Sequence, residues 1–358
     1  MKRNGKVFIL AWVMVFFTMT SIAWLNTEPS IREQSDKSLT YLTPYYGSAK
    51  MSLFDNSVKW GYIDNFGKVK ITPQFNMAYP FSEGLAFVKT ETEAGFIDET
   101  GKFVIKLDPS VFVHSPFSEG LVAVCMDKWG FMDRSGKFVI APKFDEAIKF
   151  SEGLARVAMN DKWGYIDKSG EYVIKPHFDM AYEFREGLAL VEKDGLYGFV
   201  DRSGKMVVKN KYTAAGDFVE GLAAVKLRDK YGFINKNAEV VIQPRFDWVG
   251  SFFEGMAAAR VEGKYGYINK KGQFVIPPMF DNAYRFLNGL AYVKVNGKWG
   301  VINKEGHFLI ESQFDRVESV MINGIPFSGW YLSNMTRVIK GDQVYYVNEK
   351  AQIFEIKD

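Results

Sequence analysis

The 358-residue sequence has few of the residues on which disulfide or metal chemistry depends, with one cysteine, Cys125, and three histidines. A single cysteine excludes a disulfide framework and cysteine-rich zinc sites. Neither sign of charge dominates, because 45 basic residues stand against 42 acidic ones. A chain so nearly neutral lacks the electrostatic footprint of a nucleic-acid-binding protein, so we expect no nucleic-acid partner.

Aromatic residues and glycine are abundant, with 31 Phe, 18 Tyr, 8 Trp and 32 Gly. Aromatic side chains favour the half-buried surfaces of β-sheets, and glycine favours turns. This combination predicts a protein built from many short strands.

The N-terminus has the pattern of an export signal. Lys2, Arg3 and Lys6 precede an apolar run that extends from Val7 to Leu25. Residues 1–25 are therefore expected to be either a cleaved signal peptide or a retained transmembrane signal anchor, and the pattern leaves both open. We expect an exported protein, extracellular or in the cell envelope, in which the polar residues 26–48 form a linker.

The remaining sequence is one unit of 34 residues repeated. An aromatic residue followed by glycine recurs at Trp60-Gly61, Trp129-Gly130, Trp163-Gly164, Tyr197-Gly198, Tyr231-Gly232, Tyr265-Gly266 and Trp299-Gly300, and Ala94-Gly95 fills the gap in the series. A second glycine follows most of these pairs at a turn, and a third lies in a Glu-Gly-Leu segment. Only the second repeat departs from this spacing. A period kept so closely indicates a repeat architecture.

One repeat predicts a three-stranded antiparallel meander. Residues 153–159, 162–166 and 171–174 are the expected strands, joined by turns. Pro176 is expected to prevent the third strand from continuing as a central strand. Residues 178–184 are expected to cross to the next unit, with one helical turn as an option.

The fold expected is all-β, a tandem array of these meanders over residues 49–310, in which residues 50–54 supply the first strand. Residues 311–335 are expected to be an irregular insert, and 336–358 a degenerate capping repeat. A closed propeller is the rival architecture. Nine units of three strands exceed the four to eight four-stranded blades of a usual propeller, so the open or superhelical array is favoured.

These motifs resemble the WG-repeat family, also called KWG repeats, of bacterial proteins. The resemblance is carried by Trp-Gly-Tyr-Ile-Asp, Gly-Lys-Phe-Val-Ile, Phe-Asp and Phe-Ser-Glu-Gly-Leu-Ala over about residues 50–310. It implies a bacterial repeat protein, often exported, that serves as a binding or interaction surface. The family carries no catalytic residues to transfer.

The repeated acidic residues are interpreted as structural. The carboxylates of one turn position (Asp64, Asp98, Asp133, Asp167, Asp201) give way to Asn235, Asn269 and Asn303 in later repeats. Asparagine starts a turn equally well but cannot replace aspartate as an acid or a charged metal ligand, so we expect no metal. The glutamates before the third glycine (Glu83, Glu119, Glu152, Glu186, Glu220, Glu254) are expected to face solvent or to bond to a turn.

The Trp/Tyr positions have two interpretations, a buried aromatic spine between repeats or an exposed ladder for sugar rings or peptides. The structural role is favoured, because the most regular residues of a repeat usually pack against its neighbours. The three histidines fall at different repeat positions, and Cys125 is expected to be a small buried hydrophobe.

We expect a non-enzymatic exported scaffold, without cofactor, that binds protein or peptide partners at the bacterial cell envelope. The alternative is a carbohydrate-binding module for envelope glycans that uses exposed Trp and Tyr. A hydrolase with its site in residues 311–335 is a weaker third hypothesis, because Asp315 and Glu318 lack a base–nucleophile pairing.

Overall fold

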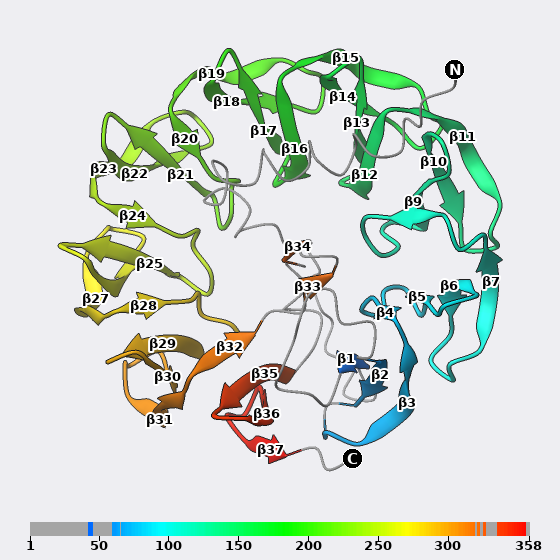
Figure 1. Cartoon of the computed structure of the whole chain (residues 1–358). Coiled ribbons are helices and arrows are strands. Elements are labelled where there is room, and N and C mark those ends of the chain that lie inside the picture. The colour runs from blue at the N-terminus through cyan, green and yellow to red at the C-terminus, as the bar shows by residue number, and fades with distance from the viewer. Residues whose placement is uncertain are drawn as a thin grey trace, which may run out of the picture.

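The structure is a computed structural model that describes residues 42–45, 59–64, 66–318, 321–322, 325–326 and 335–355. These residues form short antiparallel sheets that stand side by side around a central axis (Figure 1). Nothing within the described ranges is helical and apolar over a length that could cross a bilayer. The expected signal segment 1–25 lies outside the described residues.

Nine sheets make up the ring, and each is called a blade. The blades, in chain order, are blade 1 (β1–β3), blade 2 (β4–β7), blade 3 (β8–β11), blade 4 (β12–β15), blade 5 (β16–β19), blade 6 (β20–β23), blade 7 (β24–β27), blade 8 (β28–β31) and blade 9 (β32 with β35–β37). Blades 2 to 9 have four strands each, and blade 1 has three among the described residues. Figure 1 shows the first strand of each four-stranded blade near the axis and the last strand at the outside.

The strands occupy the same place in each repeat. The innermost strands are β4 (Met77–Ala78), β8 (Phe112–Val113), β12 (Glu146–Ser151), β16 (Met180–Arg185), β20 (Ala214–Ala215), β24 (Trp248–Val249), β28 (Asn282–Ala283) and β32 (Arg316–Glu318). The second strands are β1 (Thr43–Tyr45), β5 (Ala86–Lys89), β9 (Leu121–Cys125), β13 (Leu154–Met159), β17 (Leu188–Lys193), β21 (Leu222–Leu227), β25 (Met256–Val261), β29 (Ala291–Val295) and β35 (Met335–Lys340).

The third strands carry the aromatic-glycine pair in the regular repeats. They are β2 (Trp60–Ile63), β6 (Ala94–Ile97), β10 (Trp129–Asp133), β14 (Lys162–Ile166), β18 (Leu196–Asp201), β22 (Lys230–Asn235), β26 (Lys264–Asn269), β30 (Lys298–Ile302) and β36 (Gln343–Asn348). The outermost strands are β3 (Val69–Phe75), β7 (Phe103–Leu107), β11 (Phe138–Phe144), β15 (Tyr172–Phe178), β19 (Met206–Tyr212), β23 (Val240–Phe246), β27 (Phe274–Phe280), β31 (Phe308–Phe314) and β37 (Ile353–Glu355).

The prediction of an open or superhelical array of three-stranded meanders is wrong, because the chain forms a closed propeller-like ring of four-stranded blades. The segment 178–184, expected to be a connector, contains most of β16, which pairs with β17 of the next blade. Each connector therefore supplies the fourth strand that a propeller blade requires. All-β structure and the repeat itself were predicted correctly.

The strand predicted at residues 171–174 is longer in the structure and includes Pro176, but it is not a central strand, as expected. The strand β15 continues through Pro176 to Phe178, because it is the outermost strand and one of its edges faces solvent. Proline is tolerated on such an edge, where its missing N–H interrupts no second ladder. The register also shifts between Trp163 and Tyr165 opposite this proline, which marks a β-bulge.

Side-chain size explains why the blades turn around an axis. The buried residue of the innermost strand is small where that strand has two residues, as at Ala78 on β4 and Ala215 on β20. The buried residue at the end of the outermost strand is large, as at Phe144 and Phe178. A blade that is narrow inside and wide outside packs beside its neighbour at an angle, and repetition of that angle closes a ring.

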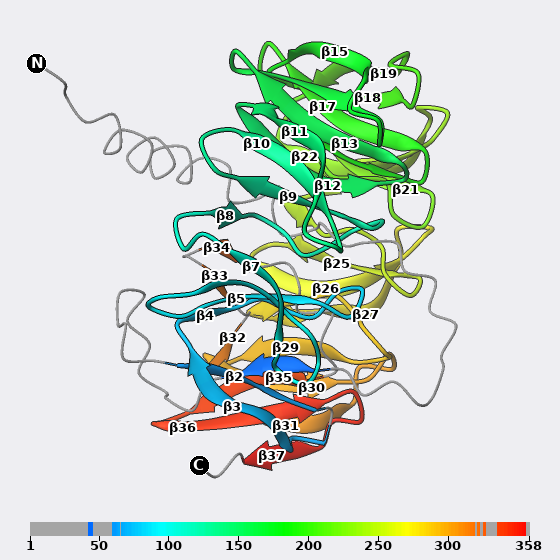
Figure 2. The same cartoon turned by 90° about the vertical axis from the view of Figure 1, so that its right-hand side faces the viewer.

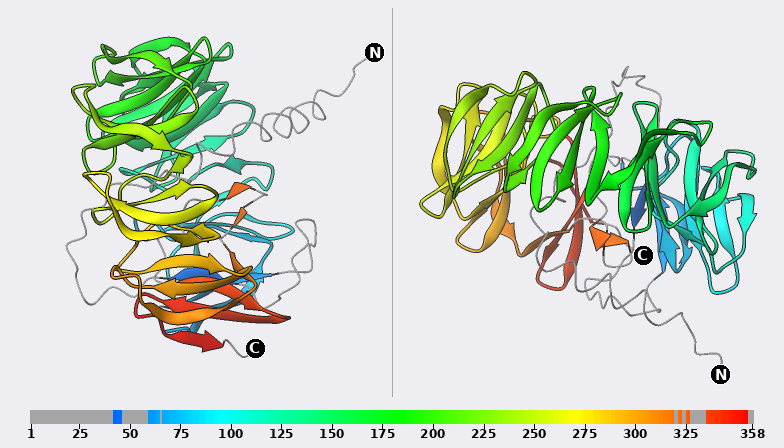
Figure 3. Two further views of the ribbon diagram at one scale, coloured as in Figure 1. Left: turned by 90° about the vertical axis from the view of Figure 1, so that its left-hand side faces the viewer. Right: turned by 90° about the horizontal axis from the view of Figure 1, so that it is seen from above.

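The ring closes where the first and last blades meet. Tyr45 and Ile63 of blade 1 share a buried cluster with Met335 and Tyr346 of blade 9. The blue and red strands lie side by side in Figures 1 and 2. The short hairpin of β33 (Met321–Ile322) and β34 (Ile325–Pro326) lies near the axis, toward the face seen in Figure 1 (Figure 3).

Three of the segments expected from the sequence overlap strands that the structure describes. The strand β1 lies inside the expected linker 26–48 and pairs with β2, the position predicted for residues 50–54, which lie outside the described residues. The expected insert 311–335 begins with the end of β31 and with β32, so the repeat extends to Glu318. The expected capping repeat 336–358 contains most of β35 together with β36 and β37, which form blade 9 with β32.

Candidate functional site

The glycine of each aromatic-glycine pair lies where two strands approach most closely. A Cβ atom at Gly164 would lie 2.4 Å from the carbonyl oxygen of Ile174 and 2.6 Å from the nitrogen of Pro176, which no real side chain tolerates. The same crowding holds at Gly61, Gly95, Gly130, Gly198, Gly232, Gly266 and Gly300, where the distance to the opposite carbonyl oxygen is 2.0 to 2.7 Å. These glycines therefore permit the bulge between the third and outermost strands.

The aromatic partner of each pair packs against the blades. Four of the seven, Trp129, Trp163, Tyr231 and Trp299, are 6 to 8% exposed, and Trp60, Tyr197 and Tyr265 are half-buried. The Trp129 ring stacks on His114, and the Trp299 ring on Tyr284, each within its own blade. At the four buried positions no exposed ring face remains for a sugar.

The recurrent aspartates organise turns. The Oδ1 of Asp167 accepts hydrogen bonds from the backbone N–H of Ser169 at 2.9 Å and of Glu171 at 3.2 Å. Asn235 makes the equivalent bonds with its Oδ1. A hydrogen bond from the Ser169 hydroxyl is the largest of the causes that lower the pKa of Asp167. The equivalence of Asp and Asn is what a turn requires.

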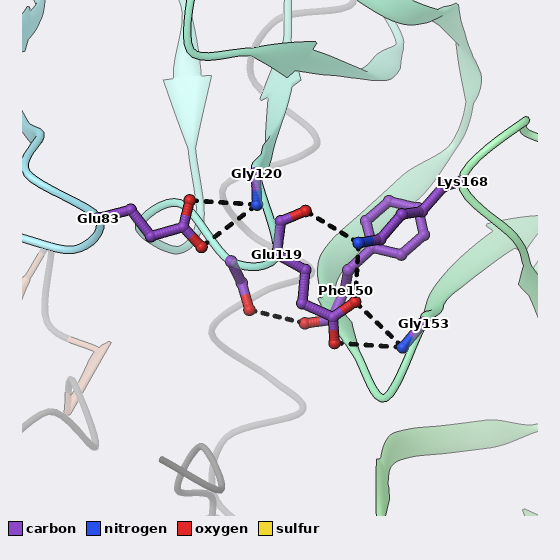
Figure 4. Close-up of polar contacts among 7 residues, drawn as sticks. Glu83, Glu119, Gly120, Phe150, Gly153 and Lys168 are labelled. Carbon is purple, nitrogen blue, oxygen red and sulfur yellow. Dashed lines mark hydrogen bonds and ion pairs between the residues drawn. The ribbon is translucent and has the colours of Figure 1, made fainter. Parts of the chain in front are cut away.

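The glutamate of the Glu-Gly-Leu segment links neighbouring blades (Figure 4). Glu119 has a positive φ of 55°, in a conformation unusual for a residue with a side chain. Its carboxylate accepts a hydrogen bond from the N–H of Gly153 in the next blade, at 3.1 Å to each oxygen. Five further pairs repeat this contact, Glu83 with Gly120, Glu152 with Gly187, Glu186 with Gly221, Glu220 with Gly255 and Glu254 with Gly289.

A lysine completes several of these contacts. Lys168 donates to the backbone carbonyl of Glu119 at 3.0 Å and forms an ion pair with its carboxylate at 3.2 Å (Figure 4). Lys236, Lys270 and Lys304 occupy the same repeat position and pair with Glu186, Glu220 and Glu254. The six glutamates thus bond to turns, one of the two roles expected of them, and the turn is that of the next blade.

Four charged side chains that sequence reasoning did not single out are buried between blades 4, 5 and 6. Arg156 on β13 lies 3.4 Å from the Glu183 carboxylate on β16, and Arg185, also on β16, lies 3.2 Å from Asp217, which follows β20. All four residues are 3 to 8% exposed. Two consecutive blade interfaces therefore each contain a buried ion pair.

Burial and the neighbouring charges shift the pKa values of the two carboxylates, Asp217 and Glu183, in opposite directions. The pKa of Asp217 is raised to about 6, because loss of water disfavours the charged carboxylate more than Arg185 favours it. Glu183 is desolvated as well, but the positive charges of Arg156, Lys149 and Arg185 together lower its pKa to about 2. Arg156 also makes a cation–π contact, since its guanidinium carbon lies 5.2 Å from the centre of the Trp163 ring.

A signal for these residues is present in the sequence. Arg156 faces Tyr165 across the strand pair, and the same register places Leu190, Ala224 and Ala258 opposite Phe199, Phe233 and Tyr267. Glu183 and Asp217 correspond in the repeat to Pro80, Lys149, Ser251 and Arg285. Comparison of each repeat position across the units identifies Arg156 where other repeats have an apolar residue, and identifies Glu183 and Asp217 where other repeats have proline, serine or a basic residue.

Within the described part of the chain, no three His, Cys, Asp or Glu residues lie together in a group that could hold a metal ion. Burial lowers the pKa of His114 to about 4, with Arg156 adding to the effect. Burial also raises the pKa of the Cys125 thiol, which is the opposite of what a nucleophile needs.

Comparison with known proteins identifies the family. The model described as WG containing repeat matches residues 60–91, 129–163, 163–197, 197–231, 231–265, 265–299 and 299–325. The chain therefore belongs to the WG-repeat family. The unmatched stretch contains most of the irregular second repeat, which has Ala94 in place of the aromatic residue.

No curated protein matches the chain. Among solved structures, a eukaryotic initiation factor is similar over 88% of this chain and 95% of its own, with 11% identity and a TM-score of 0.57. Hsv2p of Kluyveromyces lactis covers 62% of this chain and 90% of its own, with 8% identity and a TM-score of 0.39. PorZ of Porphyromonas gingivalis covers 87% and 46%, with 12% identity and a TM-score of 0.33. The first likeness shows the fold alone, and the other two scores are too low to support a conclusion.

Proposed function

We propose that this WG-repeat propeller is a non-enzymatic scaffold that binds protein or peptide partners at the bacterial cell envelope. The side chains that recur in every repeat support this proposal, because they are occupied with bulges, turns and contacts between blades. Partner binding then falls to exposed positions that the fold does not use.

The observation that carries the proposal is an apolar residue exposed on the outermost strand of seven consecutive blades. These residues are 37 to 51% exposed and are Val104, Val139, Val173, Val207, Val241, Val275 and Leu309. Exposed apolar side chains in a regular series favour a protein-binding surface. We call this series the outer rim.

The outermost strands that carry the outer rim also carry basic residues on one side of the ring. The outermost strands β3, β7, β11, β15, β19 and β23 contain exposed basic residues and no acidic ones, whereas β31 and β37 contain one glutamate each and no basic residue. The basic residues are Lys70, Lys106, Lys143, Lys175, Lys209, Lys211 and Arg245. Such a surface suits a partner with acidic and apolar side chains.

Affinity capture from envelope extracts, followed by mass spectrometry, tests this function. We expect a defined protein to be retained by the wild-type chain and lost with Val139→Ser/Val173→Ser/Val207→Ser. The matched control is Met126→Ser/Leu227→Ser, which removes exposed apolar side chains that lie off the rim and should keep the partner. Saturable glycan binding that outcompetes the protein would favour the carbohydrate alternative instead.

The envelope location is tested separately. Fractionation should place the protein outside the cytoplasm, and N-terminal sequencing of the native chain distinguishes a cleaved signal peptide from a retained anchor. Recovery of the intact chain from the cytoplasmic fraction would contradict the proposed location and leave the scaffold function standing.

A further inference from the structure

Two lysines beside the outer rim have no partner within the described part of the chain. Lys175 on β15 and Lys209 on β19 are exposed and occupy the same repeat position in blades 4 and 5. Neither ammonium group makes a hydrogen bond, an ion pair or a ring contact with a described residue. Figure 1 shows their strands at the outside of neighbouring blades.

Two other basic residues of the outermost strands are paired with carboxylates. Lys70 on β3 lies 3.6 Å from the Asp64 carboxylate, and Lys106 on β7 lies 2.6 Å from that of Glu93. The charge of each ammonium group is therefore offset within the chain.

The remaining three cations of these strands lie over aromatic rings. The Lys143 ammonium is 5.1 Å from the centre of the Phe144 ring and donates to the Gly170 carbonyl of the next blade at 3.3 Å. Lys211 and Arg245 lie at the same distance from the ring of the residue that follows each of them. These cations contact the fold itself, and the lysines of blades 4 and 5 are left available to a partner.

Each available lysine lies on the same face of its strand as a rim valine. Successive side chains of a strand alternate between two faces. On β15, Val173 and Lys175 are exposed, whereas Ile174 between them is 5% exposed. Val207 and Lys209 repeat this arrangement on β19. Each strand therefore presents an apolar group and a cation roughly 7 Å apart.

An extended acidic segment has the complementary spacing. Side chains two positions apart in an extended chain also lie on one face, about 7 Å from each other. An apolar residue followed two positions later by Asp or Glu can therefore cover the valine and pair with the lysine of one blade. One exposed ion pair contributes little by itself. Two such contacts on neighbouring blades reinforce each other when one partner makes both, because the second contact is then intramolecular.

We propose that the outer rim of blades 4 and 5 binds an extended acidic segment of the protein partner. Its carboxylates pair with Lys175 and Lys209, and its apolar side chains cover Val173 and Val207. Single valines, one in each blade, suit the separate side chains of a peptide. This inference rests on the proposed binding function and adds the place and the chemistry of the contact.

A defined peptide tests the proposal by fluorescence anisotropy with the full chain. The probe is a labelled peptide of three Val-Ser-Glu-Ser units, and its control peptide has Gln in place of Glu. We expect saturable binding of the acidic peptide, at least tenfold tighter than that of the control and weakened by added salt.

Charge reversal locates the binding site. Lys175→Glu/Lys209→Glu should weaken binding of the acidic peptide at least tenfold, because each change replaces an attraction by a repulsion. The matched variant Lys271→Glu/Lys350→Glu alters the net charge equally, at exposed turns of blades 7 and 9, and should change binding less than twofold. If the reversal at blades 4 and 5 perturbs folding, Lys175→Gln/Lys209→Gln replaces it and should weaken binding about threefold.

Equal binding of the two peptides, or equal losses in the two lysine variants, would overturn the proposal. Vesicles of phosphatidylglycerol that outcompete the peptide would also overturn it, because the surface would then prefer a lipid. Capture from envelope extracts separates this inference from the proposed function. A partner lost with Val139→Ser/Val173→Ser/Val207→Ser but retained by Lys175→Glu/Lys209→Glu would leave the function standing and contradict the acidic segment.

Discussion

Two kinds of blade interface coexist in this ring. Between blades 4 and 5, Arg156 is paired with Glu183, and between blades 5 and 6, Arg185 is paired with Asp217. Between blades 6 and 7, Ala224 and Ser251 take the positions of Arg156 and Glu183. Both kinds of interface have the same bulge and the same bond between glutamate and glycine, so the ion pairs are an addition to a common design.

The difference between the two kinds of interface indicates what the buried charges contribute to stability. A buried ion pair is often no more stabilising than apolar residues of the same volume, because both charges lose their water. Removing one partner is costly, however, because it leaves the other charge buried and unpaired. The contribution of each pair is therefore measured by removing one partner and then both.

Breaking one pair should have the largest effect. Arg156→Leu, which introduces the residue of the next repeat, leaves Glu183 buried without its cation and should lower the free energy of unfolding by about 3–5 kcal/mol. Urea denaturation measures the loss. The double variant Arg156→Leu/Glu183→Ser removes both charges and should recover most of it. If the single and double variants are equally stable, the pair has no coupling and the comparison fails.

The glycine of the aromatic-glycine pair should matter equally at both kinds of interface. Gly164→Ala places a Cβ against the Ile174 carbonyl and should cost about 3 kcal/mol or more. Gly187→Ala is the matched control, because its Cβ would meet open space and only the positive φ of 84° is unfavourable. We expect about 1 kcal/mol there, again by urea denaturation. Similar losses at the two sites would show that crowding at the bulge is not what selects glycine.

Stability should depend on pH differently at the two ion pairs. Because the pKa of Asp217 is about 6 in the folded chain and that of a free aspartate is 3.8, the folded state binds the extra proton. Asp217 therefore contributes stability that increases as the pH falls from above 6 toward 4, by about 1–3 kcal/mol. The pKa of Glu183 is lowered, so its contribution is lost only as the pH falls below about 4.5 toward 2.

Urea midpoints at pH 7, 6 and 5 and constant ionic strength check this dependence. The wild-type chain should gain stability relative to Asp217→Asn over that range. Parallel profiles for the two proteins would mean that Asp217 does not titrate there.

The smallest effect is expected at the bonds between glutamate and glycine. Glu119→Ala loses the acceptor for the Gly153 N–H and should cost about 1 kcal/mol. Glu99→Ala, which removes an exposed glutamate in a turn, should change stability by less than about 0.5 kcal/mol. Urea denaturation of the two variants would reveal equal, negligible losses if the bond between blades contributes nothing.

The repeat could be predicted from the sequence, but the closure of the blades into a ring could not. The 34-residue period, the turns at the aspartates and the all-β class follow from glycine spacing and turn chemistry, which are local. Residues 178–184 lack the alternation of a half-buried strand, because Ala181, Tyr182, Glu183 and Phe184 are all buried. Their identity as the inner strand depends on the neighbouring blades, which no local pattern shows.

The interface residues were missed for a related reason. Glu119 was expected to face solvent or to bond to a turn, and only the stacked arrangement places its carboxylate beside Gly153 of the next repeat. Arg156 and Asp217 are 61 positions apart and come together only through Glu183 and Arg185. Pairings between repeats depend on how the units stack, and the period alone fits an open array and a closed ring equally well.

Distance measurement between the end blades tests the closed ring most directly. Spin labels at Lys68 in blade 1 and Lys350 in blade 9, both exposed, can be introduced as cysteines in a Cys125→Ala background. The account predicts a dominant short distance, about that between neighbouring blades, in double electron–electron resonance. A dominant long distance, with the short one absent, would show that the repeats form an open array and would contradict the ring.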